Sequence, residues 1–191
     1  MQIAIVVVIA NCRGNISIKN VDEKSQLTGI SLLLNKSLHQ EWQLREKQKV
    51  KRMYGLHERQ FRRFMMMAQR TREPTGAALL KLLERRLDNV VYRLGFARSR
   101  PQVRQLVSHG LVQVDGRQVN IPSYILTPGQ VVELKETVLK IPDVVDLAEQ
   151  KPYVPEWLER RDGGGQVVRE PRREEIDQDI NERLIVEFYS R

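Results

Sequence analysis

The amino-acid sequence predicts an α+β fold, in which a helical domain accompanies a compact module of two helices packed on a small antiparallel sheet. Three observations indicate this fold. Leucine and valine recur at helical spacing over residues 75–94, a helix-start signal lies at Ser99, and alternating valines flank the dipeptide Asp115-Gly116. Such patterns are typical of amphipathic helices that lead directly into a β-hairpin.

The two helices of the module are delimited by capping residues. Thr75 is expected to cap a helix that runs to residue 94 and stops at Gly95. Ser99 is expected to cap a second helix, which ends at Gly110.

The sheet of the module is expected directly after these helices. Asp115-Gly116 suits a two-residue hairpin turn with positive φ, and Pro128-Gly129 suits another turn before a strand over residues 131–136. Residues 77–139 are therefore predicted to form the α+β module.

The helical domain is predicted from residues 41–76 together with parts of residues 140–191. Two helices, at about residues 42–53 and 57–71, are expected to meet at Tyr54-Gly55. The second has a core face, whose members recur at helical spacing: Phe61, Phe64, Met65 and Ala68.

The two ends of the chain have weaker patterns. Residues 1–40 form an atypical N-terminal segment, read as a strand or two with loop; its apolar run Ile3–Ala10 is too short to span a bilayer and lacks the basic flank of a signal peptide. After residue 139 the chain is rich in proline and acids, and Gly163–Gly165 is expected in a loop. Near the end, Leu184, Val186 and Phe188 alternate as in a strand or close a last helix; a helical turn at Ile180–Leu184 that leads into an extended tail is expected.

Positive charge is concentrated in one part of the chain. The formal net charge is +8, but residues 41–110 alone have 17 Lys or Arg against 6 Asp or Glu, whereas residues 111–191 are net acidic. So few acids cannot neutralise so many bases, and a solvated face of ion pairs therefore explains the pattern poorly. The excess indicates a polyanionic partner, most commonly a nucleic acid.

Catalytic and metal-binding chemistry is not indicated. Cys12 is the only cysteine, and His39, His57 and His109 lack metal-ligand spacing. The sequence contains no glycine-rich phosphate loop or nucleophile elbow. We therefore predict no enzyme activity, no cofactor, no metal site and no small-molecule substrate.

A cluster of arginines on the module is the candidate binding surface. The arginine fork suits phosphate, and the helix N-terminus at Ser99 offers free backbone N–H groups. Two helices around a glycine turn also resemble a helix-turn-helix that reads DNA, but only Gln102 and Gln105 could read bases from the second helix. RNA recognition needs less sequence reading. Tyr54 and His57 could stack on bases, although core packing suits Tyr54 equally well.

The stretch LERRLDNVVYRLGFARSRPQVRQLVSHGLVQVDGRQVNIPSY closely resembles the RNA-binding module of the bacterial-type small-subunit ribosomal protein four family. That module also occurs in some RNA-modifying enzymes, which would require an additional catalytic domain. Three flanking stretches, Leu44–Arg63, Thr75–Asn89 and Leu184–Arg191, resemble the ribosomal protein itself. Residues 1–40 differ from the basic, often zinc-binding start that is usual in the family.

The resemblance implies which residues bind RNA. In the module they are Arg85, Arg86, Arg98, Arg100, Arg104, His109 and Arg117. In the helical domain they are Lys47, Lys49, Lys51, Arg52, Arg62 and Arg63.

The resemblance also implies the partners and the role. It implies binding to the 5′ domain of 16S ribosomal RNA, early nucleation of the body of the 30S subunit, and contacts with ribosomal protein five and the messenger RNA entry path. A contribution to translational accuracy and a location in the small ribosomal subunit, in the bacterial cytoplasm or an organelle, follow from the same resemblance. No membrane partner is expected.

Overall fold

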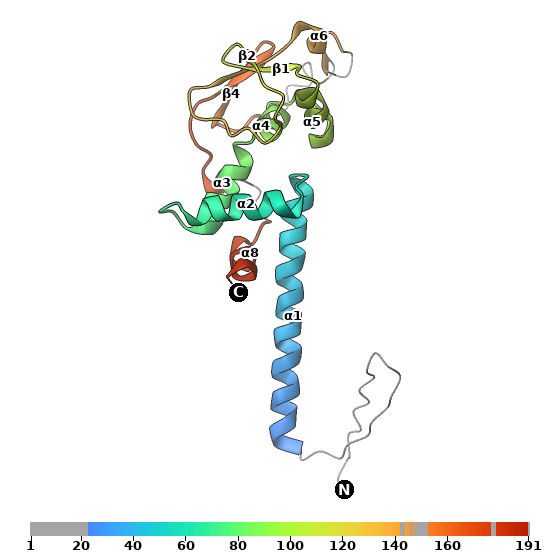
Figure 1. Cartoon of the computed structure of the whole chain (residues 1–191), viewed down its shortest axis with the longest axis vertical. Helices are drawn as coiled ribbons and strands as arrows, with labels where there is room; N and C mark the ends of the chain where they lie inside the picture. The colour runs from blue at the N-terminus through green and yellow to red at the C-terminus, as the bar shows by residue number, and fades with distance from the viewer. Residues whose placement is uncertain (1–22, 142–143, 146, 148–152, 177–178, 191) are drawn as a thin grey trace. The chain divides into compact units, whose positions relative to one another are not determined.

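The computed structural model describes residues 23–141, 144–145, 147, 153–176 and 179–190, with side chains from Leu38 onward (Figure 1). The chain divides into two compact units, residues 1–42 and 43–191. Helix α1 (Glu23–Met53) begins in the first unit, and its last turns belong to the second.

The expectation of strands and loop over residues 1–40 is wrong for residues 23–40, which are helical. This stretch contains no proline and only one glycine, Gly29, and it is rich in leucine, a good helix former. The strand expected at Ile3–Ala10 lies outside the described residues.

The helical core of the second unit packs the end of α1 against α2 (Glu58–Gln69), α3 (Thr75–Glu84) and α8 (Glu182–Tyr189). The predicted helices on either side of Tyr54-Gly55 are confirmed, and Gly55 makes the turn with a φ of +60°. The predicted core face of α2 is buried: Phe61, Phe64, Met65 and Ala68.

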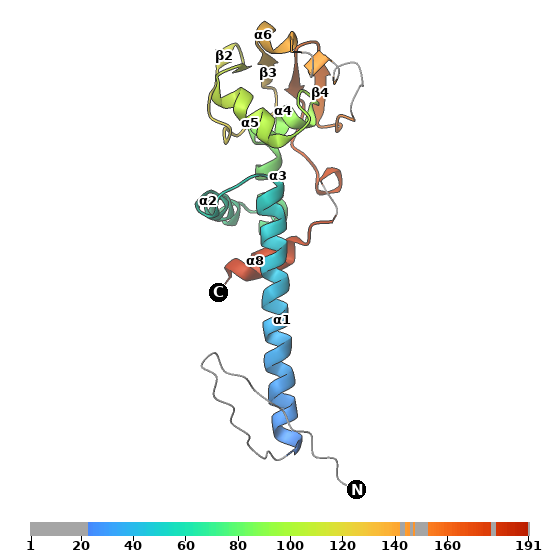
Figure 2. The same ribbon diagram turned by 90° about the vertical axis from the view of Figure 1, so that its right-hand side faces the viewer.

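The α+β class is confirmed by a second core, which lies beneath a five-stranded antiparallel sheet of order β2-β1-β3-β5-β4. Helices α4 (Leu87–Arg93) and α5 (Arg100–Ser108) cover one face of this sheet (Figures 1 and 2). The strands are β1 (Val112–Val114), β2 (Arg117–Gln118), β3 (Val131–Leu134), β4 (Leu158–Arg161) and β5 (Gly164–Val167), and a short helix α6 (Glu136–Leu139) follows β3. Asp115 and Gly116 turn the predicted hairpin with φ values of +49° and +75°.

The predicted helix over residues 75–94 is interrupted at Arg85 and Arg86. Residues 122–126 compete for its backbone: the amide of Leu126 donates to the carbonyl of Arg85 at 2.9 Å, and the amide of Leu87 donates to the carbonyl of Tyr124 at 2.8 Å. Pairing with a distant extended segment therefore overrides the helical preference of the sequence at this point.

The prediction of a loop at residues 163–165 is wrong in part, since Gly164 and Gly165 lie inside β5. A Cβ at Gly164 would clash with the carbonyl oxygen of Val132, and one at Gly165 would lie 2.5 Å from Leu94. These glycines let β5 approach β3 and the core, so the sheet extends well beyond the expected end of the module at residue 139.

The C-terminal prediction is also corrected. Instead of a helical turn at Ile180–Leu184 and an extended tail, α8 runs from Glu182 to Tyr189. Ile185 on this helix is fully buried, together with Ile176 and Ile180 before it. The alternation of apolar residues near the chain end thus belongs to a helix that closes the helical core. A short 3-10 helix, η1 (Arg173–Glu175), precedes it.

Candidate RNA interface

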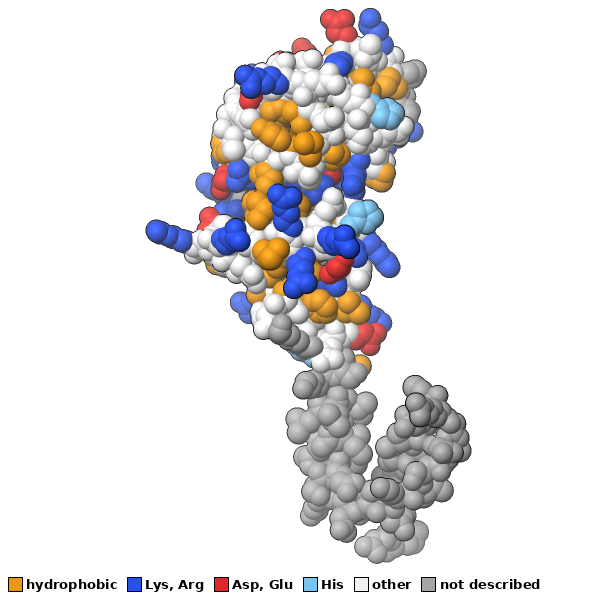
Figure 3. Space-filling view, viewed as in Figure 1, with side chains coloured by type: hydrophobic (Ala, Val, Ile, Leu, Met, Phe, Trp, Pro, Cys, Tyr) orange, Lys and Arg blue, Asp and Glu red, His pale blue; other side chains and the backbone are white. Residues whose placement is uncertain are grey.

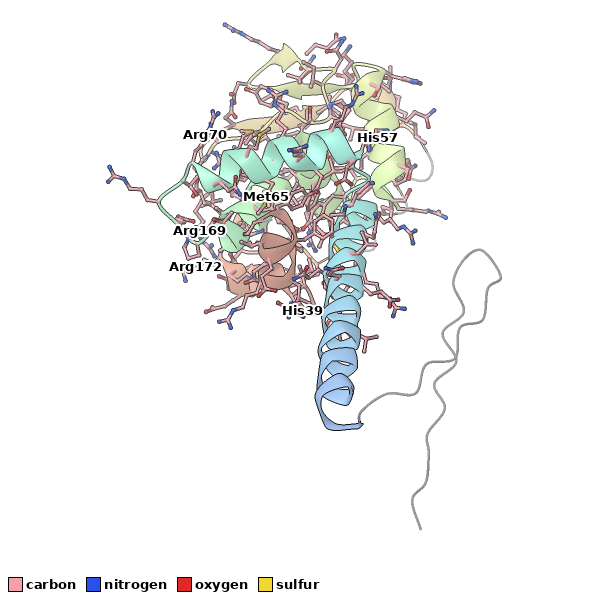
Figure 4. The ribbon with its side chains drawn as sticks, turned by 60° about the horizontal axis from the view of Figure 1, so that its bottom comes forward. His39, His57, Met65, Arg70, Arg169 and Arg172 are labelled. Carbon is pink, nitrogen blue, oxygen red and sulfur yellow. The ribbon has the colours of Figure 1, made fainter. Side chains whose placement is uncertain are left out.

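The exposed face of α2 is a row of cations. Arg59, Arg62, Arg63 and Arg70 are exposed at positions i, i+3, i+4 and i+11, opposite the buried face of the helix. Blue side chains gather over α2 in Figure 3, and Figure 4 shows His57 and Arg70 at its two ends. Within the part of the chain that the structure describes, the side chains of Arg59, Arg62 and Arg63 make no hydrogen bond or ion pair, so their guanidinium groups are available to phosphates. We call these four arginines the α2 stripe.

The one acidic residue of α2 does not weaken this stripe, because other groups engage it. Glu58 accepts hydrogen bonds from Lys47 at 3.1 Å, from Lys51 at 3.2 Å and from the hydroxyl of Tyr189 at 2.8 Å. Burial alone would raise the pKa of Glu58, but these hydrogen bonds outweigh it and lower the pKa to about 2.

Three lysines predicted to bind RNA are held by other groups of the protein. Lys47 is 6% exposed, and its Nζ lies 4.3 Å from the ring centroid of Phe188. Lys49 donates to the carbonyl of Asp179 at 2.6 Å, and Lys51 is paired with Glu58. Arg52, by contrast, is exposed near the start of the stripe.

The neighbouring arginines Arg85 and Arg86 have different surroundings. Arg85 donates to the carbonyl of Leu126 at 2.8 Å and pairs with Glu170 at 2.6 Å. Arg86 is 1% exposed, pairs through two nitrogens with Asp88 at 2.9 and 2.5 Å, and lies over the ring of Phe64. We leave Arg86 out of the RNA face because a buried guanidinium with a carboxylate partner cannot reach a phosphate.

The start of α5 has the features of an anion site. Ser99 occupies the N-cap position without a side-chain hydrogen bond, and Arg98 and Ser99 are exposed. The second residue of this nine-residue helix, Pro101, has no N–H, so the N–H groups without a partner inside the first turn are those of Arg100 and Gln102, close to the exposed Arg98.

Two further arginines of α5 reach toward the helical core. The guanidinium of Arg100 lies between the rings of Tyr54 and Tyr92, at 5.2 and 4.5 Å from their centroids. The Nη1 of Arg104 donates to the carbonyl of Gly55. Both side chains are partly exposed, so each binds α5 to the α1–α2 turn while keeping one edge toward solvent.

The remaining predicted residues lie at the far end of the module. His109 is the exposed C-cap residue of α5, and Arg117 is exposed in β2 at the edge of the sheet. The structure thus brings Arg98, Arg100 and Arg104 together on and beside α5, and places Arg117 on a separate element.

Tyr54 is a core residue, which resolves the alternative left open by the sequence. It is 2% exposed, and its hydroxyl donates to Glu84 at 2.5 Å. Burial, together with the nearby charge and hydrogen bond of Glu84, raises the pKa of Tyr54 well above its ordinary value. His57, in contrast, is exposed at the start of α2 and remains able to contact a base.

Sequence reasoning missed Arg59 and Arg70 as site residues, although their spacing from Arg62 and Arg63 is helical and could have revealed them. It also missed Glu84, which is buried at 1% exposure in contact with Arg93, Asn89 and Tyr54. An acid at the end of an amphipathic, leucine-rich helix does not by itself indicate a buried or functional residue.

Other chemistries find no support among the described residues. No group of three or more His, Cys, Asp or Glu in the described ranges is placed to hold a metal ion. In that same part of the chain, no helix combines the length and apolar character needed to cross a bilayer.

An α+β module with a cationic helix beside it is typical of an RNA-binding protein, and comparison with known proteins identifies the family. Residues 85–132 match the S4 domain, and residues 15–84 match the ribosomal protein S4/S9 N-terminal domain. The second match begins inside the segment that we expected to be atypical.

Curated relatives define the family. The small ribosomal subunit protein uS4 of Dictyoglomus thermophilum is 56% identical over 151 residues, covering 78% of this chain and 73% of the relative. The protein of the same name from Natranaerobius thermophilus is 49% identical over 177 residues, covering 90% and 85%. The chain belongs to the small ribosomal subunit protein uS4 family. It is a structural constituent of the small ribosomal subunit with an RNA-binding S4 domain, and it is not an enzyme.

Proposed function

We propose that this protein binds the 5′ domain of 16S ribosomal RNA early, and so nucleates assembly of the body of the 30S subunit. The observation that carries the proposal is the α2 stripe, a row of exposed arginines without carboxylate partners in the described part of the chain. Such a surface neutralises phosphates where RNA helices converge. The resemblance of Leu44–Arg191 to the ribosomal family supports the choice of RNA.

The proposed RNA face combines two parts of the second unit. Residues 41–76 with parts of residues 140–191 form the helical RNA-binding part, and residues 77–139, extended by β4 and β5, form the S4 module. The face consists of His57, Arg52, the α2 stripe, and the side chains on and beside α5, namely Arg98, Arg100, Arg104 and His109, with Arg117 at the hairpin. Arg85, Lys47, Lys49 and Lys51 make hydrogen bonds or ion pairs within the protein, and we propose that they act indirectly, by holding in place the elements that carry the face.

Further partners follow from the family resemblance and are part of the proposal. We infer contacts with ribosomal protein five and with the messenger RNA entry path, a contribution to translational accuracy, and a place in cytoplasmic ribosomes. The resemblance of the stretch Leu184–Arg191 to the ribosomal protein itself, rather than to other proteins that contain the module, supports this assignment.

The decisive experiment measures binding of the purified chain to a transcript of the 16S 5′ domain across a salt series. Duplex DNA and an unrelated folded RNA serve as competitors. We expect the ribosomal RNA to win by about a thousandfold at physiological salt, the lower end of the usual ratio of specific to non-specific binding. Equal competition by all three would show a generic polyanion binder and would contradict the proposal.

A further inference from the structure

A buried acid lies at the place where the helical core meets the S4 module. Glu84, the last residue of α3, is 1% exposed. Its carboxylate accepts hydrogen bonds from the Tyr54 hydroxyl at 2.5 Å, from Asn89 Nδ2 at 2.7 Å and from Arg93 Nη2 at 3.0 Å. One side chain thus joins the end of α1, the end of α3 and the length of α4.

Further contacts extend from this acid to α5. The Oδ1 of Asn89, whose amide is already oriented by Glu84, accepts a hydrogen bond from Arg100 Nε at 2.9 Å. The Arg100 guanidinium is then held between the rings of Tyr54 and Tyr92. Because Tyr54 also donates to Glu84, two of the three supports of Arg100, namely Asn89 and the Tyr54 ring, depend on the same carboxylate.

The geometry beyond Arg100 explains why its position matters. Arg100 is the first residue of α5, next to the exposed N-cap Ser99. The middle of α5 is tied to the α1–α2 turn by the Arg104 hydrogen bond to Gly55, directly before the α2 stripe (Figure 1). The contacts around Glu84, together with the Arg104 hydrogen bond, therefore fix the start of α5 relative to the cationic row on the helical core.

We propose that Glu84 is a positioning residue for RNA binding, which fixes Arg100 and the start of α5 relative to the α2 stripe. It touches no RNA itself and acts through Asn89, Tyr54 and Arg100. Prearranging two phosphate-binding surfaces reduces the ordering that binding requires, so affinity rises without an added contact. The inference rests on the proposed function.

Removing the negative charge of Glu84 has opposite expected effects on RNA affinity under the positioning role and under simple charge repulsion. An acid next to an RNA face repels phosphate, so removing one should tighten binding if its charge alone mattered. Glu84→Gln instead weakens RNA binding by about tenfold, because loss of the positioning contacts costs preorganisation. Glu73→Gln removes an exposed acid from the segment before the same helix and serves as the charge-matched control, with binding equal to or slightly tighter than wild type.

The test is a double-mutant cycle on the full chain, with the 5′-domain transcript as the probe and circular dichroism as the check of folding. The variants are Glu84→Gln, Arg100→Gln and both together. If Glu84 acts through Arg100, the double variant binds within about twofold of Arg100→Gln, whereas independent effects would multiply. Tyr54→Phe removes one hydrogen bond to Glu84 but keeps the ring; it is run in the same cycle and is expected to weaken binding about fivefold, in keeping with one lost hydrogen bond.

Each result has one meaning. Weaker binding by Glu84→Gln or Tyr54→Phe that disappears on the Arg100→Gln background supports the inference. Multiplying effects, or a folded Glu84→Gln that binds as tightly as Glu73→Gln, overturn it. If Glu84→Gln does not fold, the Tyr54→Phe cycle decides the matter alone. Failure of the proposed function is distinguished by wild type, which would then show no preference for the ribosomal transcript.

Discussion

The hydroxyl of Tyr189, in the last turn of α8, donates a 2.8 Å hydrogen bond to Glu58 at the start of α2. The Tyr189 ring also stacks on Phe61, with centroids 5.9 Å apart. This hydrogen bond joins two residues that are 131 positions apart in the chain, next to Arg59, the first arginine of the α2 stripe. The C-terminal helix is consequently part of the scaffold that orients the stripe.

This contact predicts how stability depends on acid. The pKa of Glu58 is lowered from its ordinary 4.5 to about 2, so the folded chain holds this carboxylate ionised more strongly than the unfolded chain does. The stabilisation is therefore complete above pH 4.5, declines as the pH falls, and is lost near pH 2. Because Glu58 is half-exposed and screened by solvent, we expect only about 1 kcal/mol.

Thermal melting from pH 7 to pH 2 checks this prediction. Glu58→Gln should be less stable than wild type at about pH 7, and the difference should shrink below pH 4.5. Glu133→Gln, which replaces an exposed carboxylate in β3, is the control and should melt in parallel with wild type. A constant difference between Glu58→Gln and wild type at every pH would contradict the prediction.

The buried pair of Arg86 and Asp88 predicts a large loss of stability. Their side chains are 1% and 5% exposed, so Asp88→Asn leaves a guanidinium charge in the core without its partner. Breaking such a pair costs about 3–5 kcal/mol. Urea denaturation should show this loss, whereas Glu159→Gln, in the exposed pair with Arg161, should change stability by less than about 1 kcal/mol. Similar values for the two variants would mean that Arg86 is not buried in solution.

We predict that β5 does not tolerate a side chain at Gly164, although the sequence indicates a loop there. A Cβ at Gly164 would clash with the Val132 carbonyl and would separate β3 from β5. Gly164→Ala should destabilise the protein by about 3 kcal/mol or more, in the range of severe backbone clashes. Gly116→Asn is the control: its turn is open and its positive φ suits asparagine, so we expect a change within about 1 kcal/mol. Denaturant unfolding measures both, and a tolerated alanine would show that residue 164 is not in a central strand.

The α2 stripe predicts a specific change in the salt dependence of RNA binding. Arg62→Gln combined with Arg63→Gln should lower the slope of log affinity against log salt by about 1.4–1.8, that is, by about 0.7–0.9 per phosphate contact. Lys140→Gln combined with Arg161→Gln removes the same charge from the sheet-bearing part and should leave the slope nearly unchanged. Equal slopes for the two double variants would show that Arg62 and Arg63 do not contact RNA phosphates.

Local signals in the sequence were sufficient for the hairpin, for the second module helix and for the core face of α2. Asp115-Gly116 and Ser99 act within a few residues, so their conformations follow from their own surroundings in the chain. The break at Arg85 and the strand at Gly164 were not predictable in this way, because each depends on a segment far along the chain.

The same distinction applies to the candidate RNA face. Charge patterning found the basic region, and Arg62, Arg63 and Arg98, which the structure leaves exposed, were implied by the family resemblance. It could not separate these from Arg86 or Lys47, because burial and pairing with carboxylates are set by tertiary packing. Helical spacing identifies a surface only after the buried face is known.

The helical core has a consequence for how the chain is made. Its buried residues come from two stretches, Val50–Leu83 and Ile176–Ile185, whereas the core under the sheet lies between them, within residues 87–167. On a translating ribosome the S4 module can complete its core while the helical part still lacks the isoleucines at positions 176, 180 and 185. The newly made protein therefore completes the packing behind its α2 stripe only after residues 176–185 have emerged.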